Sequence, residues 1–138
     1  MARARILKSR VTILFIAAAV MTALAVWTSV ALAAGTPGTV TISSTTHPDP
    51  AVWYPSANPK FTWTAAQETG GSGTIAGYSY VLDQNPATVP PEQVTSTDDT
   101  KKYDTLAPGV WYFHIRARDG AGNWGPTRTY GMLHMNVE

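Results

Sequence analysis

The strongest constraint on the fold is the run WYFHIRARD, from Trp111 to Asp119, in which large apolar and polar side chains alternate. A period of two places successive side chains on opposite faces of a β-strand. The run ends in GAGN, whose Gly120, Gly122 or Asn123 can adopt positive φ, and residues 127–137 then return as a second strand. The inward side chains predicted for this hairpin are Trp111, Phe113, Ile115 and Ala117, then Leu133, Met135 and Val137.

The chain before this hairpin also has the pattern of strands. Short alternating runs occur at 39–46, 60–64 and 77–83, and no window of a dozen residues has helical spacing of apolar positions. The segment 47–59 contains four prolines, which cannot donate to a sheet, so a long crossing loop is predicted there. The polar stretch 84–102 is predicted to cross the surface with a short edge strand around 93–96. The fold class expected is all-β.

The first 33 residues differ from the rest. A basic start precedes an apolar run from 11 to 34 that ends in the small-residue pattern Ala31-Leu32-Ala33, as in a secretory signal peptide cleaved after Ala33 or Ala34. The run is also long enough to remain as an uncleaved membrane anchor in a hydrophobic helix. We therefore expect residues 34–138 to be one secreted, extracellular domain, or alternatively a domain held outside the membrane by its N-terminal segment.

Charge and cysteine content narrow the possible partners. Four of the ten basic residues lie in 1–33 and none of the nine acidic ones does, so residues 34–138 carry six basic against nine acidic side chains, a formal charge of −3. Nucleic acid is not an expected partner of such a domain. The chain has no cysteine, so the core must stabilise the fold without disulfides.

A family resemblance covers nearly all of this domain, about residues 38–137. The segments FTWTAA, GYSYVLD and LAPGVWYFHIRARDGAGNWGP resemble strands B, C, F and G of a fibronectin type III domain, especially those of secreted bacterial proteins. Trp63 matches the buried tryptophan of strand B and Tyr78 the tyrosine of strand C. The resemblance implies a seven-stranded antiparallel β-sandwich. It implies no ligand, because this fold hosts many functions.

The sequence departs from the family at one position. Trp111 stands where the family usually has a corner tyrosine, whose hydroxyl bonds back to the chain. The indole N–H either replaces that hydrogen bond or leaves it unmade.

Motifs for catalysis are missing from the sequence. It has no cysteine nucleophile, no G-x-S-x-G, no H-E-x-x-H and no phosphate-binding loop, so no catalytic residue, enzyme activity or cofactor is expected. His114 and His134, on consecutive strands, could bind zinc with Asp83 if they were cross-strand neighbours, but a zinc site needs further ligands. Two surface histidines with no metal are the expectation.

Binding residues are expected in two places. The outward side chains of the last two strands are rich in the Tyr, Arg and Met types of protein interfaces, although they also suit a solvated sheet face. These side chains are Tyr112, His114, Arg116, Arg118, Arg128, Tyr130, Met132 and His134. Three aromatic residues fall in loops or turns, either displayed for stacking on sugar rings or plugging the ends of the sandwich: Trp53, Tyr54 and Trp124.

Two functions follow from these surfaces. The first is a non-enzymatic module acting in protein interaction or as a structural or adhesive spacer, with Tyr112, His114, Arg116, Tyr130 and His134 as candidate contacts. The alternative is a module that binds a cell-wall or extracellular glycan through the loop aromatics.

Overall fold

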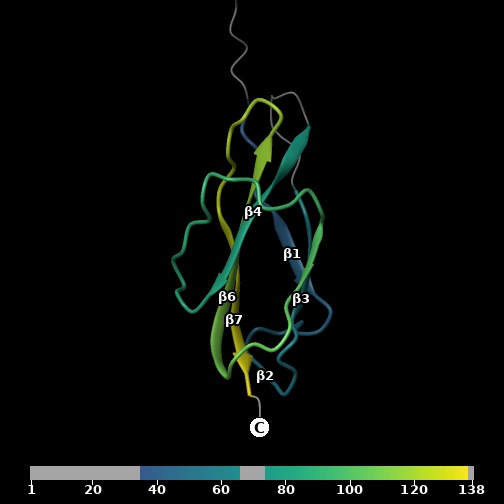
Figure 1. Cartoon of the computed structure of the whole chain (residues 1–138), viewed down its shortest axis with the longest axis vertical. Helices are drawn as coiled ribbons and strands as arrows, with labels where there is room; N and C mark the ends of the chain where they lie inside the picture. Colours follow the sequence, from purple (N-terminus) through teal and green to yellow (C-terminus); the bar gives the residue numbers. More distant parts are fainter. Residues whose placement is uncertain (1–34, 66–73, 137–138) are drawn as a thin grey trace, which may run out of the picture. The chain divides into compact units, whose positions relative to one another are not determined.

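The computed structural model describes residues 35–65 and 74–136. The predicted signal segment, most of the Gly-rich turn after Thr64, and Val137 lie outside these ranges. The described part contains seven strands and no helix (Figure 1). The strands are β1 (Thr41–Ser44), β2 (Trp53–Tyr54), β3 (Lys60–Thr64), β4 (Ile75–Asp83), β5 (Thr100–Lys102), β6 (Gly109–Asp119) and β7 (Arg128–Met135). The expected all-β class is confirmed.

The strands form two sheets, in the orders β1-β3-β5 and β2-β7-β6-β4. Every pair is antiparallel except β2 and β7, which run parallel with Trp53 opposite His134. The expectation of a purely antiparallel fold is therefore wrong at this edge. The proline-rich crossing predicted as a loop contains this two-residue strand, which lies at the sheet edge where neighbouring prolines interrupt no central ladder.

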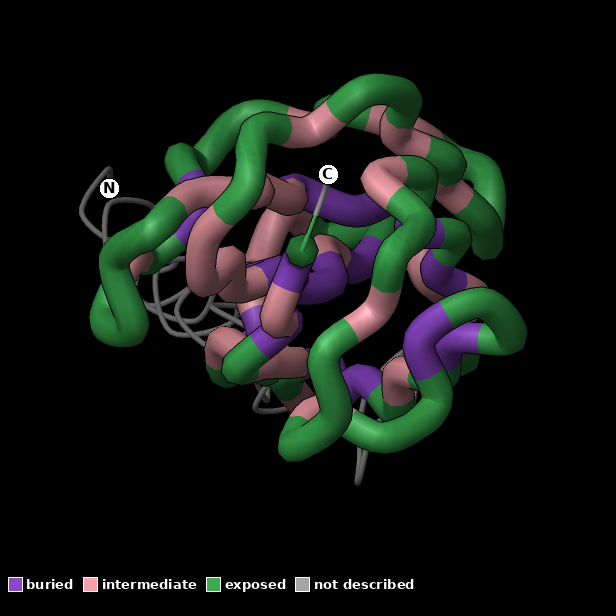
Figure 2. The backbone as a smooth tube through the Cα atoms, turned by 90° about the horizontal axis from the view of Figure 1, so that it is seen from below, coloured by how far each residue is buried: buried purple, intermediate pink, exposed green. Residues whose placement is uncertain are grey.

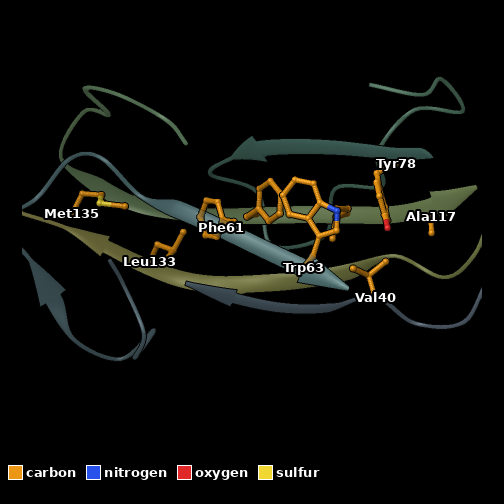
Figure 3. Packing of buried hydrophobic residues seen from close by; sticks show 9 residues of the cluster. Val40, Phe61, Trp63, Tyr78, Ala117, Leu133 and Met135 are labelled. Atoms are coloured by element: carbon orange, nitrogen blue, oxygen red, sulfur yellow. The ribbon is translucent and has the colours of Figure 1, made fainter. Parts of the chain in front are cut away.

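The hydrophobic core lies between the two sheets. Phe61 of β3 stacks on Phe113 of β6 with ring centroids 4.3 Å apart, and Trp63 meets Tyr78 edge to face at 5.7 Å. Figure 3 shows Phe61, Trp63 and Tyr78 with Leu133 and Met135 of β7 between the layers. In Figure 2 the buried stretches lie mostly inside a ring of exposed loops. The inward positions predicted for β6 and β7 are confirmed for Phe113, Ile115, Ala117, Leu133 and Met135.

A bulge in β7 reverses the predicted direction of Tyr130. Trp111 pairs with Leu133 and Phe113 with Tyr130, so β7 has one more residue than β6 between these pairs. Gly131 stands in the bulge with φ of 154°, where a Cβ would come within 2.9 Å of the Trp111 carbonyl oxygen. Tyr130 consequently packs edge to face on Phe61 and its hydroxyl donates to the His47 carbonyl at 2.7 Å. It was predicted to face outward, and that prediction is wrong.

The segment from Gln84 to Asp99, which we call the strap, covers part of the outer face of β4 and β6. The predicted edge strand around 93–96 is reduced to a bridge, in which Tyr78 N donates to Ser96 O at 2.8 Å and Thr95 N to Tyr78 O at 2.7 Å. Under the strap, His114 is fully buried and Arg116 is only 9 % exposed. The expectation of a surface histidine and a surface arginine at these positions is wrong, because strand alternation does not say whether another segment covers the outer face.

The indole of Trp111 makes the bond that the sequence left open. Its Nε1–H donates to the Ala107 carbonyl oxygen at 3.0 Å. A tryptophan thus ties the start of β6 to the turn that precedes it.

Candidate functional site

The part of the outer sheet face that combines exposure with large apolar side chains lies across β2, β7 and β6. We call it the Trp53 face, and it consists of Trp53, Val110, Tyr112, Met132 and His134. Backbone register builds its centre, because Trp53 pairs with His134 and His134 pairs with Val110, so three strands each contribute one side chain to a row. Trp53 is 54 % exposed and Met132 48 % exposed.

His134 supports the indole of Trp53. The two ring centroids are 4.5 Å apart with the planes tilted by 47°. The Nδ1 atom of His134 is buried and has no hydrogen-bond partner among the described residues. The imidazole ring thus packs against the Trp53 indole at the sheet surface.

Tyr112 and Met132 extend the face along the bulge. Tyr112 lies against Gly131, since a Cβ on this glycine would come within 2.9 Å of the tyrosine ring. Met132 follows Gly131 and projects outward, as predicted. Sequence reasoning did not select Val110, which precedes the alternating run; its place opposite His134 depends on the register of β6 and β7.

His114 anchors the strap to β6. Its Nε2 lies 2.8 Å from the Asn85 carbonyl oxygen and its Nδ1 2.9 Å from the Thr129 hydroxyl. The carbonyl can only accept, so Nε2 carries the proton. Asp83 lies 3.4 Å from the same nitrogen. His114 thus binds the strap to β6 and offers no ring atom to a partner.

The carboxylate of Asp83 is stabilised at the same place. Partial burial acts to raise its pKa, but hydrogen bonds from Thr88 and Asn85 together with the nearby His114 lower it below the ordinary value. The Thr88 hydroxyl donates to this carboxylate at 2.6 Å. Asp83 therefore holds the first turn of the strap in its ionised form.

The histidine pair considered for zinc is not brought together. His114 is opposite Thr129 and His134 is opposite Val110, so the two are not cross-strand neighbours. Within residues 35–65 and 74–136, no three His, Cys, Asp or Glu side chains gather as a metal site would require.

The three loop aromatics have different environments. Tyr54 packs on the buried His47 with ring centroids 4.6 Å apart, and its hydroxyl accepts a hydrogen bond from Asp49 N. The ring of Trp124 lies 4.8 Å from the Arg116 guanidinium, which covers it. Of these three residues, Trp53 alone is exposed while Tyr54 and Trp124 are half-buried, so the three do not form a shared aromatic platform.

The Trp53 face lies at the end of the domain opposite the place where the chain enters it. Pro37 lies against Gly125 beside the β6–β7 turn, since a Cβ on this glycine would approach the Pro37 carbonyl oxygen to 2.6 Å. Trp53 pairs instead with His134 near the end of β7, and Figure 1 shows β2 at the far end of the sheet. The first described residues thus lie at the end of the domain remote from the Trp53 face.

Comparison with protein-family models, curated proteins and solved structures finds no match to this chain. None of the described residues forms a helix long and apolar enough to cross a membrane.

Proposed function

We propose that this chain is a non-enzymatic, fibronectin type III-like module, secreted or displayed on the cell surface, that binds an extracellular protein through the Trp53 face. The observation that carries the proposal is a half-exposed tryptophan on the edge strand β2, which packs on the His134 ring of the neighbouring strand. Large apolar side chains displayed together on a sheet, rather than singly, mark binding surfaces.

The strand arrangement supports the family part of the proposal. In an immunoglobulin-like sandwich, strands A, B and E share one sheet and C, F and G the other. The sheets β1-β3-β5 and β7-β6-β4 have this arrangement when β1, β3 and β5 are taken as A, B and E. Two further features agree with this arrangement. Trp63 is a core residue of β3, the strand taken as B, and the Trp111 indole bonds Ala107 at the start of β6.

The composition of the face favours a protein partner. Tryptophan, tyrosine and methionine are enriched at the centres of protein interfaces, where they bury large areas and exclude water. Val110 extends the apolar area from His134 onto β6, and Met132 extends it along β7. A glycan platform remains the alternative because Trp53 presents a ring to solvent, but Tyr54 and Trp124 do not join it.

The proposal is tested with Trp53→Ala in the full chain, expressed in its native host. Proteins at the cell exterior that bind the chain are crosslinked to it and captured with it. Val89→Ala is the matched control, because Val89 is 62 % exposed on the strap and lies outside the Trp53 face. Removing a central aromatic anchor typically costs about 2 kcal/mol or more, which is about thirtyfold in Kd. We expect Trp53→Ala to weaken binding of the purified captured protein by that factor, and Val89→Ala to leave it unchanged.

The competing outcomes are distinct. The glycan function is assigned if no protein is captured, the wild type retains a purified extracellular polysaccharide, and Trp53→Ala does not retain it. Equal capture by wild type and Trp53→Ala removes the Trp53 face from the binding site.

A further inference from the structure

A polar site lies on the same sheet face, displaced from His114 toward the β6–β7 turn, where the strap also covers the sheet. We call it the Arg116 site, and it consists of Ser79, Glu92, Arg116 and Trp124. Ser79 of β4 and Arg116 of β6 are cross-strand partners, and their side chains point to the outer face. Trp124 comes from the turn, where it bridges to Arg118.

Two polar atoms of this site are buried without a hydrogen-bond partner among the described residues. Ser79 is fully buried and Arg116 is 9 % exposed. Among the described residues, the Ser79 hydroxyl and the Arg116 Nε–H are buried atoms without a hydrogen-bond partner. A buried polar group in this state costs about 1–3 kcal/mol, and more when it is charged. Two such groups opposite each other in register point to a ligand that bonds both.

The charge of Arg116 is only loosely compensated. Glu92 Oε1 lies 3.8 Å from Arg116 Nη1, beyond hydrogen-bond distance, and the Glu92 side chain is 74 % exposed. The other neighbour is the Trp124 ring at 4.8 Å, which attracts the cation but accepts no conventional hydrogen bond. The guanidinium thus lies over the Trp124 ring, and its Nε–H has no hydrogen-bond partner among the described residues.

We infer that the Arg116 site binds a carboxylate, which takes two N–H bonds from the Arg116 guanidinium, including the one at Nε, and a third from the Ser79 hydroxyl. The guanidinium fork matches the two oxygens of a carboxylate, and such bidentate pairs are among the strongest hydrogen bonds in proteins. Glu92 stands at the solvent side of the guanidinium as an internal competitor. An incoming carboxylate displaces Glu92 outward, where this side chain is already solvated.

This inference does not depend on the function of the Trp53 face. The two sites share a sheet but no residue, and His114 with its strap contacts lies between Tyr112 and Arg116 along β6. A variant that abolishes binding at one site therefore still allows binding at the other to be measured.

The experiment follows the Arg116 Nε–H and Trp124 indole N–H signals by ¹H–¹⁵N NMR while the full chain is titrated with sodium acetate at constant ionic strength. N-acetylglycine, N-acetylaspartate amide and glucuronate are then compared, because they present a chain-end, a side-chain and a sugar carboxylate. Inorganic phosphate is the non-carboxylate anion.

Three variants sharpen the test. Arg116→Lys keeps the charge but removes the fork and the Nε–H, and we expect at least tenfold weaker acetate binding. Glu92→Gln removes the competitor; exposed ion pairs are worth about 0.2–1 kcal/mol, so binding should tighten about 1.4- to fivefold. Arg128→Lys, an exposed arginine on β7, is the matched control and should change nothing.

The inference is overturned if acetate leaves both signals unmoved, if Arg116→Lys binds acetate as well as the wild type, or if phosphate binds and carboxylates do not. Because Glu92 is exposed, Glu92→Gln keeps the fold. Unchanged acetate affinity in this variant also overturns the displacement of Glu92, even if Arg116→Lys unfolds.

Discussion

Replacing Tyr130 with phenylalanine tests whether this side chain serves the fold or a binding face. Its hydroxyl donates to the His47 carbonyl at 2.7 Å and also lies 3.1 Å from the Pro48 carbonyl, so it ties the proline-rich crossing to β7. Burial is the main reason that its pKa is raised, with Tyr54 and Asp49 adding to the shift. The ring keeps its packing on Phe61 after the change, so the hydrogen bonds alone are removed.

The expected loss follows from this geometry. A net hydrogen bond contributes about 0.5–1.5 kcal/mol, and a carbonyl left without a donor beside the fully buried His47 adds to the cost, giving about 1–2 kcal/mol. In a domain of this size, 1 kcal/mol lowers Tm by about 4–8 °C. We therefore expect Tyr130→Phe to lower Tm by about 5–15 °C in calorimetry, with affinity for a partner of the Trp53 face unchanged.

Tyr112→Phe is the control, because the Tyr112 hydroxyl has no hydrogen bond within the described ranges and should change stability by less than about 0.5 kcal/mol. An unchanged Tm for Tyr130→Phe, together with weakened partner binding, would refute the reasoning and return this tyrosine to the outer face.

Three further results are expected. Gly131→Ala should destabilise the domain by about 1–3 kcal/mol in urea unfolding, since a Cβ at φ of 154° meets the Trp111 carbonyl oxygen at 2.9 Å; an unchanged midpoint would contradict the bulge. Trp111→Phe should lower the free energy of unfolding by about 1–2 kcal/mol in urea unfolding, because it removes the indole hydrogen bond to the Ala107 carbonyl. An unchanged free energy of unfolding would show that this bond does not stabilise the domain. Burial and the neighbouring Tyr80 raise the pKa of Tyr103, so the neutral phenol is the form that the fold favours. Its contribution is complete below the ordinary tyrosine pKa of about 10 and is lost as pH rises above it, so urea midpoints should fall less steeply there for Tyr103→Phe than for the wild type.

The sequence alone determined several of the strands and the centre of the core. Alternation with period two depends only on neighbouring residues, and it predicted β3 with its boundaries, the β6–β7 hairpin and the inward set from Phe113 to Ala117. A positive φ at Gly122 in the turn was likewise local information. These features needed no knowledge of what the strands pack against.

The tertiary structure decided which outward residues are free to bind. One extra residue in β7 turned Tyr130 inward, although the local pattern points it to solvent. The strap buried His114 and nearly buried Arg116, because its path over β4 and β6 is fixed by the Tyr78–Ser96 pairing and by Asn85. Parallel pairing of β2 with β7 placed Trp53 beside His134, residues separated by about eighty positions in the chain. Register, bulges and covering segments are set by contacts between distant residues, so a one-dimensional pattern does not contain them.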